Sequence, residues 1–296
     1  MSREGLTFTM VFLAESANYG EGVSNISALK KMSRGNYEQY TYISRQAIRY
    51  NIIQQLNWNN TPVALVGKGK DVVQFAPSAT IKEYPEIDLF GYMKTTSKKD
   101  GNDKGKASTR SAVVRLSNAV ALEPYQSDLE FLTNMGLAKR QNLENGIAQS
   151  EIHRSFYTYT ITIDLDKIGI DGEICISQEE KARRVKDLLD TIQFLYRDIK
   201  GRRENLAPVF VIGGRYVRKN PFFENRILLN KGKVQIDTLT EIIESSSDIK
   251  DNTFVGVASG IFENDVELKQ VLHTKAIAEV FNHLKKEVDE YYGESN

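Results

Sequence analysis

The chain has 296 residues, and its 39 basic side chains equal its 39 acidic ones, so the formal net charge is zero. With 41% hydrophobic and 26% charged residues it has the composition of a globular protein, which excludes disordered, collagen-like and fibrous classes. A single cysteine, Cys175, excludes an internal disulfide and favours a reducing cytoplasm, and no apolar stretch approaches the ~20 residues of a membrane-spanning helix.

The N-terminal part of the chain begins with a strand pattern over 6–13, where apolar residues alternate along one face. Apolar residues then recur at helical spacing over roughly 43–56, which predicts an amphipathic helix. The residues on its expected apolar face are Ile43, Ala47, Tyr50 and Ile53. Residues 94–110 contain no apolar side chain except Ala107, so we expect a mobile basic loop there.

The middle of the chain, 117–154, contains an apolar cluster that is too dense for an unstructured loop. Its members are Leu129, Phe131, Leu132, Met135 and Leu137. We interpret 117–154 as a projecting arm that packs either on its own core or on a neighbouring subunit.

The C-terminal half opens with a strand over 156–165, in which apolar residues alternate with threonines. Ser177 and Glu180 fit a capping box that starts a long helix, whose apolar spacing continues to Ile199. The remaining predicted elements are a buried strand over 208–213, a turn at Lys231–Gly232, a strand over 254–257 and a closing helix over 277–291. This order favours an α+β fold, in which 1–296 form a single elaborated RRM-like or ferredoxin-like domain with large insertions.

The zero net charge conceals an uneven distribution along the chain. Residues 1–120 carry a surplus of +6, 121–200 carry −4, 201–233 carry +6 and 234–296 carry −8. Salt screens charges beyond about 8 Å, so a polyanion responds to the local potential. The two basic blocks form one electropositive groove if the fold brings them together; the alternative is a solvated surface with an acidic C-terminal helix.

No motif in the sequence supports catalysis. The three histidines lie far apart without companions at ligand spacing, so we expect no metal site. Asp164 and Asp166 could hold Mg²⁺, but this pattern at a strand end more often turns the chain. The Gly-Lys-Gly-Lys run at 67–70 lacks the phosphate-loop pattern, and Cys175 has no recognisable histidine partner.

Basic residues on predicted elements are more informative. Arg45 and Arg49 are four residues apart on one face of the first helix, beside Ser44. Their mutual repulsion costs about 0.2–0.5 kcal/mol, and a phosphate lying across both would reverse that sign. The Lys-Gly-Arg-Arg-Glu-Asn run at 200–205 follows the long helix, where it either complements the helix dipole or forms an anion-binding turn.

Several segments, in their order over most of 6–213, resemble the backbone subunit of type I CRISPR interference complexes (Cascade). The similarity is greatest to the DevR-type branch of subtype I-B. The segments that carry the resemblance are Ser44-Arg-Gln46 with Arg49, Asp88-Leu-Phe-Gly-Tyr-Met93, Ser117-Asn-Ala-Val-Ala-Leu122, the strand over 156–165 and Gly201-Arg-Arg-Glu-Asn205.

This resemblance implies a non-enzymatic subunit with an RRM-like palm, a fingers-like insertion over 60–116 and a thumb-like arm over 117–154. Several copies polymerise along one CRISPR RNA, and each thumb flips out a nucleotide, leaving the others to pair with target DNA in antiviral defence. The implied partners are CRISPR RNA, target DNA, further copies of the chain and other Cascade subunits. No cofactor and no membrane are implied, and the location is cytoplasmic.

The resemblance also implies roles for individual residues. Those expected to contact the guide RNA are Ser44, Arg45, Gln46, Arg49, Gly91, Tyr92, Met93, Arg110, Arg115, Lys200, Arg202, Arg203 and Asn205. Leu132 or Met135 is expected to be the wedge of the thumb, and the basic loop over 94–110 to lie near the nucleic acid. A guide held without reading its sequence calls for contacts to phosphate and sugar.

Two alternatives remain open. Related backbone subunits of type III complexes cut target RNA with an acidic residue in a palm loop, for which Glu15 and Glu21 are the candidates here. A DNA-binding transcriptional regulator is the other, although no helix-turn-helix pattern is legible.

Overall fold

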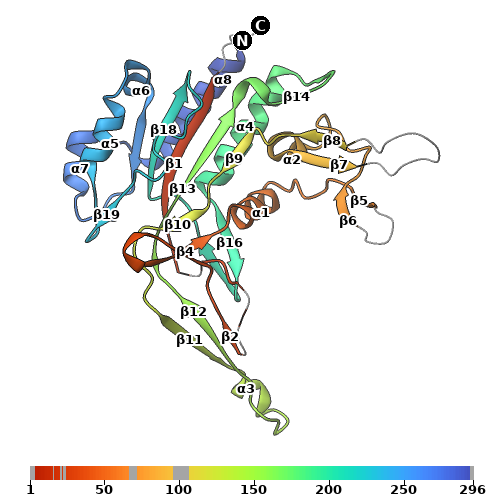
Figure 1. Cartoon of the computed structure of the whole chain (residues 1–296), viewed down its shortest axis with the longest axis vertical. Coiled ribbons are helices and arrows are strands. Elements are labelled where there is room, and N and C mark those ends of the chain that lie inside the picture. The colour runs from red at the N-terminus through yellow and green to blue at the C-terminus, as the bar shows by residue number, and fades with distance from the viewer. Residues whose placement is uncertain are drawn as a thin grey trace.

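The structure, a computed structural model, describes residues 4–293 except 16, 21, 23–24, 67–71 and 96–106. Its centre is an eight-stranded antiparallel sheet in the order β21–β18–β1–β13–β10–β4–β3, with β9 also paired to β13 (Figure 1). The strands of this sheet are β1 (Gly5–Ala14), β3 (Lys31–Ser33), β4 (Gln39–Ile43), β9 (Val114–Leu116), β10 (Ala119–Ala121), β13 (Ser155–Asp164), β18 (Phe210–Tyr216) and β21 (Phe254–Val257).

Eight α-helices occur in the described residues, together with two short 3₁₀-helices, Gly35–Tyr37 and Leu165–Lys167. The α-helices are α1 (Arg45–Gln55), α2 (Pro85–Phe90), α3 (Met135–Ala138), α4 (Gln178–Gln193), α5 (Ile236–Ile243), α6 (Ser247–Asn252), α7 (Asp265–Leu272) and α8 (Ile277–Gly293). None of the helices in these described ranges is both long and apolar enough to cross a membrane.

Short strands outside the central sheet pair mostly as hairpins. These are β5 (Val63–Val66) with β6 (Val72–Phe75), β7 (Tyr92–Thr95) with β8 (Ala107–Arg110), β14 (Ile170–Asp171) with β15 (Ile174–Cys175), β16 (Tyr196–Ile199) with β17 (Arg202–Asn205), and β19 (Leu229–Asn230) with β20 (Lys233–Val234). The longest hairpin, β11 (Asp128–Thr133) with β12 (Ile147–Ile152), also pairs with β2 (Ile26–Ser27).

The core lies on both faces of the central sheet. On one face, apolar residues of β1 and β13 pack against α1, α4 and α8. The β1 residues on this face, Leu6, Phe8, Met10 and Phe12, are buried as their alternation predicts. Phe8 packs edge-on against Phe281 of α8, with the ring centroids 6.2 Å apart. On the opposite face, β18 and β21 pack against α5, α6 and α7 in a second core.

Most predicted elements are present, with altered details. The strands predicted over 6–13 and 156–165 are β1 and β13, the later strands are β18 and β21, and the closing helix is α8. The helix predicted over 43–56 is α1, but its buried residues are Ile48, Ile52 and Ile53, while Tyr50 is exposed. The periodicity therefore predicted the helix correctly but was wrong about some of the residues on its buried face.

The prediction that the long helix reaches Ile199 is wrong. Ser177 caps α4 by accepting a hydrogen bond from the Glu180 backbone nitrogen, as expected, but the helix ends at Gln193. The chain then enters the β16–β17 hairpin, whose two-residue turn, Lys200–Gly201, has positive φ at both positions. A hairpin forms here in place of further helical turns because its cross-strand partners Arg197 and Glu204 form a buried ion pair at 2.6 Å.

The basic loop predicted over 94–110 is shorter at both ends. Lys94 and Thr95 belong to β7, and 107–110 form β8, which pairs with it. Lys94 is buried, donates a hydrogen bond to the Ala79 carbonyl and lies over the Tyr92 ring. Residues 96–106 lie outside the described residues.

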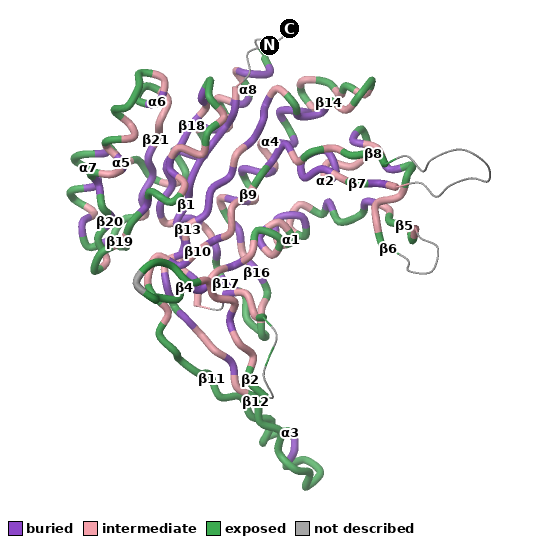
Figure 2. The backbone as a smooth tube through the Cα atoms, in the orientation of Figure 1, coloured by how far each residue is buried: buried purple, intermediate pink, exposed green. Residues whose placement is uncertain are grey.

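The hairpin β11–β12, with α3 at its tip, projects away from the central sheet (Figure 1). Every residue of β11 is exposed, as Figure 2 illustrates along the length of the projection. The first residues of the segment expected to form an arm, 119–121, are instead β10 of the central sheet. The projecting part therefore begins near Asp128.

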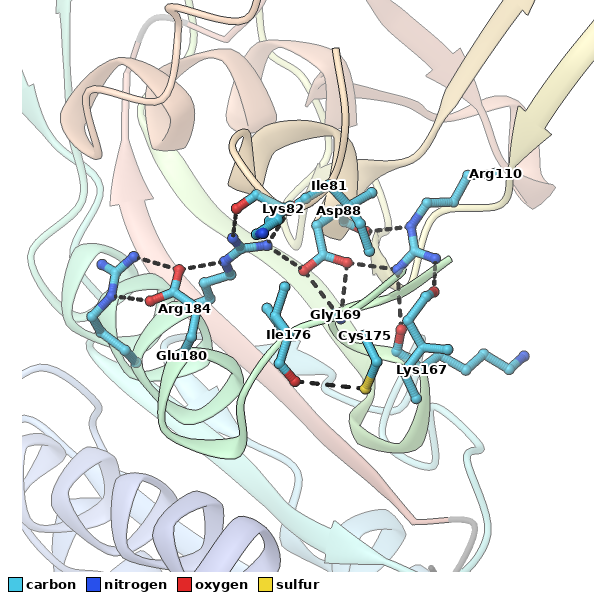
Figure 3. A network of polar contacts seen from close by, with 12 residues as sticks. Ile81, Lys82, Asp88, Arg110, Lys167, Gly169, Cys175, Ile176, Glu180 and Arg184 are labelled. Carbon is cyan, nitrogen blue, oxygen red and sulfur yellow. Dashed lines mark hydrogen bonds and ion pairs between the residues drawn. The ribbon is translucent and has the colours of Figure 1, made fainter. Parts of the chain in front are cut away.

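A buried carboxylate joins α2 to three other parts of the chain (Figure 3). The side chain of Asp88 is 0% exposed, and its oxygens accept hydrogen bonds from Arg110 at 2.6 Å and from Arg184 at 2.8 Å. The Gly169 backbone nitrogen donates to the same carboxylate at 2.9 Å. One charge thus connects α2, β8, α4 and the loop before β14.

The two arginines use their remaining donors on other acceptors nearby. These are the Ile81 and Lys82 carbonyls and the Glu180 carboxylate for Arg184, and the Asp88, Lys167 and Ile170 carbonyls for Arg110. A buried ion pair offsets its desolvation cost only when its other hydrogen-bonding groups are satisfied, and that condition is met here. We call Asp88, Arg110 and Arg184, with these partners, the Asp88 network.

We expect Asp88→Asn to lower the free energy of unfolding by about 3–5 kcal/mol, because it leaves the buried guanidinium of Arg110 without its carboxylate partner and that of Arg184 with Glu180 alone. Denaturant unfolding measures this loss. The matched control is Asp187→Asn on the surface of α4, which pairs with Arg183 and should cost less than about 1 kcal/mol. Equal losses for the two variants would contradict the role assigned to the network.

Candidate nucleic-acid interface

The N-terminus of α1 is fixed by two asparagines from distant segments. Ser44 caps the helix by accepting a hydrogen bond from the Ala47 nitrogen, and its own backbone nitrogen donates to the Asn18 side chain at 2.9 Å. The Arg45 nitrogen donates to Asn118 Oδ1, also at 2.9 Å. With the backbone held in this way, the side chains of Arg45 and Gln46 point outward and are exposed.

Three of the arginines expected to bind the guide line one groove beside α1. Its volume is about 390 Å³, and it is lined by Arg45, Gln46, Arg49, Phe90, Ala112, Val114, Arg115 and Leu116. We call it the arginine groove. Two of its arginines come from α1 and one from the edge strand β9, so it exists only in the folded chain.

Arg49 is the central cation of the arginine groove. Its guanidinium lies 4.9 Å from the centroid of the Phe90 ring and 3.4 Å from a Glu86 carboxylate oxygen. Burial lowers the pKa of Arg49, and Glu86 partly opposes that shift. Arginine stays charged in proteins, and partial desolvation strengthens its contact with an anion.

Arg115 lines the arginine groove from β9 and is about half exposed. It donates to Asp164 at 3.0 Å. Burial raises the pKa of Asp164, but the hydrogen bond and charge of Arg115, helped by Lys219 and Lys167, outweigh it, so the pKa lies below its usual value. Asp164 therefore stays ionised and orients Arg115.

A second hollow of about 490 Å³ adjoins the arginine groove, sharing Arg49 and Phe90 with it. Its walls include Gly91, Tyr92 and Met93, the turn expected to approach a phosphate. The Tyr92 hydroxyl donates to Asp171 at 2.8 Å, while Met93 is exposed. The structure thus places this turn beside Arg49, with Phe90 as a shared wall that sequence reasoning did not single out.

Arg110 also borders this second hollow, but its side chain is only 7% exposed and belongs to the Asp88 network. Its guanidinium is held by Asp88 and by the Lys167 and Ile170 carbonyls. The Arg110 side chain therefore supports the wall of the second hollow, and each of its three guanidinium nitrogens already donates a hydrogen bond within the chain rather than to a nucleic acid.

The residues of 200–205 that were expected to contact the guide RNA lie away from the arginine groove. Arg202 pairs with Glu15 at 2.5 Å, and Arg203 pairs with Asp198 at 2.9 Å. Lys200 lies over the Tyr19 ring and donates to Ser150 of β12. The hairpin β16–β17 thus lies at the base of the projection, and none of its residues lines the arginine groove.

Asn205 uses its side-chain oxygen to accept a hydrogen bond from the Ala207 nitrogen, which stabilises the end of this hairpin. The two basic blocks of the sequence therefore do not merge in a single groove among the described residues. All residues lining the arginine groove come from 1–120. Acidic partners close to β16–β17 satisfy its cations locally, which charge counting along the chain does not reveal.

The apolar residues of the projection do not pack on the chain's own core. Leu129, Phe131, Leu132, Met135 and Leu137 are all exposed. Of the two partners considered from the sequence, the core of the same chain is therefore excluded for these side chains. The two candidate wedge residues, Leu132 and Met135, lie near the tip of the projection.

The acidic candidates for catalysis are occupied or outside the described residues. Glu15 pairs with Arg202, and its backbone nitrogen donates to Glu204. Glu21 lies outside the described residues. Asp166 pairs with Lys219. Within the described ranges, no group of three or more histidine, cysteine or acidic side chains is arranged to hold a metal ion.

Comparisons with known proteins give a consistent picture. A model of the family described as CRISPR-associated negative auto-regulator DevR/Csa2 matches residues 6–235. A CRISPR-associated protein Cas7/Cst2/DevR from Myxococcus xanthus (strain DK1622) is 33% identical over 165 residues, which are 52% of this chain and 54% of that protein. The matched region thus spans about half the length of this relative.

Two solved structures share the fold. One is a chain of a CRISPR RNA-guided surveillance complex, pre-nicking, with a TM-score of 0.59 and 11% identity over 96% of this chain and 100% of that one. The other is a chain of a CRISPR RNA-guided surveillance complex, with a TM-score of 0.54 and 12% identity over 99% of this chain and 100% of that one. At these identities the likeness establishes the fold alone.

We expect Gly91→Ala to lower the free energy of unfolding by about 1–3 kcal/mol, because φ of 73° with ψ of 174° is a conformation open essentially to glycine. An added Cβ would also lie 2.7 Å from the Ala112 nitrogen and closer still to the Arg110 carbonyl oxygen. Denaturant unfolding measures the effect. Gly136→Ala is the control, since a Cβ there meets nothing within 4 Å, and a comparable loss in it would contradict this account.

Proposed function

The chain belongs to the DevR/Csa2 family of CRISPR-associated proteins, and on that premise we propose that it is a non-catalytic, guide-RNA-binding backbone subunit of a type I, Cascade-type complex of subtype I-B. Several copies bind side by side along one CRISPR RNA. They present its bases for pairing with target DNA in antiviral defence, together with other subunits of the complex.

The observation that carries this proposal is the convergence of Arg45, Arg49 and Arg115 on one groove. Phosphate contacts from arginine hold a nucleic acid without reading its sequence, which suits a subunit that must accept any guide. Arg45 has no ion-pair partner in the described part of the chain, so its charge is available to a phosphate. Ser44 and Gln46 flank it at the helix N-terminus, where the helix dipole also favours an anion.

The topology supports an RRM-like palm. The strands β18, β1, β13 and the β9–β10 pair lie side by side in that order. Helix α1 comes between β1 and β9–β10 in the chain, and α4 comes between β13 and β18. This is the βαββαβ connection of a split βαβ fold. Residues 114–116 of the segment expected to form the fingers are β9 of the central sheet. We therefore assign 60–113 to the fingers and the projection within 117–154 to the thumb.

The occupied state of Glu15 supports a non-catalytic role. Its carboxylate is paired with Arg202, and both residues lie at the base of the projection beside Glu204. A carboxylate engaged in this way is not available to a metal ion or to an attacking nucleophile. No specific observation favours the ribonuclease considered from the sequence, and the transcriptional regulator is favoured only by the description of the matching family as a negative auto-regulator.

Polymerisation is supported by the exposed apolar side chains of the projection. Exposed apolar clusters on a folded chain mark interaction sites, and these belong to an element that its own core does not cover. A second copy bound to the same RNA supplies the missing contact. The mixture of acidic and basic segments in the chain limits repulsion between such neighbours.

We expect Arg45→Ala to weaken binding of single-stranded RNA and to reduce the slope of log affinity against log salt by about 0.7, since one phosphate contact is lost. Fluorescence anisotropy over a series of salt concentrations measures both quantities. Arg183→Ala is the matched control, because it removes the same charge from an exposed site on α4. Identical slopes for the two variants would place the guide elsewhere.

We expect Phe131→Ser to reduce the number of copies that assemble on a long RNA while leaving single-copy binding to a short RNA unchanged. Phe131 is 57% exposed, so the unfolding free energy should change by less than about 0.5 kcal/mol. Light scattering or mass photometry of the two complexes counts the copies. Val266→Ser, an exposed apolar position on α7, is the control, and an unchanged count for Phe131→Ser would contradict neighbour contact through the projection.

A further inference from the structure

A small polar pocket lies on the face of the central sheet opposite α1, α4 and α8. Its volume is about 160 Å³, and it is lined by Ser117, Asn118, Val120, Thr158, Tyr159, Thr160, Glu224 and Asn225. We call it the sheet pocket. The Thr158 and Thr160 side chains reach it because they alternate along β13 with Tyr157 and Tyr159, which face the helices.

The sheet pocket forms where one strand is interrupted. Strands β9 and β10 both pair with β13 and are separated by Ser117 and Asn118. The Ser117 hydroxyl accepts a hydrogen bond from the Thr160 backbone nitrogen at 2.9 Å, which replaces a backbone hydrogen bond of the sheet. The Asn118 side chain accepts a hydrogen bond from the Arg45 backbone nitrogen. Such interruptions re-aim side chains beside functional sites.

The lining of the sheet pocket contains no lysine or arginine, and it includes the carboxylate of Glu224. A phosphate would be repelled there, whereas a neutral group that both donates and accepts hydrogen bonds would be matched. Among the described residues, two polar groups in the pocket lack a hydrogen-bond partner, which such a group could supply. The Thr158 hydroxyl is buried without a hydrogen bond, and the Glu224 carboxylate has no ion pair or hydrogen bond within the part of the chain that the structure describes.

The sheet pocket adjoins the arginine groove. Leu116 lines the groove and the next residue, Ser117, lines the pocket, while Asn118 connects the pocket to Arg45. Arg115 of the groove is opposite Thr162 in the register and so lies on the same face of the sheet as Thr158 and the pocket. A sugar–phosphate chain that follows Arg115 around the edge of the sheet can therefore reach the pocket.

We propose that the sheet pocket binds a ribose 2′-hydroxyl and thereby makes the chain prefer RNA to DNA, an inference that rests on the proposed guide-RNA function. The 2′-hydroxyl donates to Glu224 and accepts from Thr158, which completes both groups. It is the one sugar group that distinguishes RNA from DNA. A ribose contact also leaves every base edge available for pairing.

The test compares the affinity of the full chain for a single-stranded RNA and for the DNA of the same sequence at one salt concentration. The wild type should bind RNA more tightly. In the double variant Thr158→Val and Glu224→Ala the ratio of the two affinities should fall by about fivefold, as expected for the loss of one or two hydrogen bonds. Thr158→Val keeps the side-chain shape and removes a hydroxyl that has no partner, so folding should be preserved.

Two controls separate the causes. Glu241→Ala on α5 removes the same charge from an exposed site, so it corrects for a general gain in anion affinity and should leave the ratio unchanged. Single 2′-deoxy substitutions along the RNA should reproduce the loss at regularly spaced positions, whereas base changes should not.

The outcomes are distinct. An unchanged ratio in the double variant, or sensitivity to base identity in place of the 2′-hydroxyl, overturns the sheet-pocket inference. Equal wild-type affinity for RNA and DNA also overturns it and leaves guide binding intact. Failure of the wild type to bind either nucleic acid overturns the proposed function as well.

Discussion

The position of the arginine groove depends on one carboxylate that has no contact with water. Asp88 accepts hydrogen bonds from Arg110 at 2.6 Å and from Arg184 at 2.8 Å, and through them it joins α2 and β8 to α4. In a region of low dielectric, a charge arrangement of this kind has one favourable geometry and no inexpensive alternative. Phe90 and Gly91, two and three residues after Asp88, line the hollows beside Arg49 because this geometry sets where α2 ends.

Local sequence pattern predicted the elements that build the sheet. The strands β1 and β13 were legible because each buries alternate residues on the helix-covered face, and Ser177 marked the start of α4 because a cap is a contact within one turn. The end of α4 was not legible. Leu195 and Ile199 continue the helical period, yet the ion pair between Arg197 and Glu204 and the Lys200–Gly201 turn favour a hairpin, and periodicity does not weigh those terms.

In the candidate site, too, local features could be predicted from the sequence and contacts between distant segments could not. Arg45 and Arg49 could be paired from their spacing on α1, and Arg115 joins them because β9 lies beside that helix. The separation of Arg202 from this groove could not be predicted, since its partner Glu15 is 187 residues away. The Asp88 network could not be predicted for the same reason, because Arg184 lies 96 residues from Asp88 and neither local sequence pattern indicates the contact.

The exposed projection has a consequence for how copies of the chain would occupy a guide RNA. Strands β11 and β12 pair with a third strand, β2, over only two residues, and every residue of β11 is exposed. So small a sheet has little stability of its own, and its strands gain much of their order from what covers them. In the proposed function, a copy that binds beside an occupied site supplies that cover, while an isolated copy does not. Occupancy of a guide should therefore be cooperative, with contiguous runs of subunits favoured over scattered ones, and the ends of a run should be its least stable members.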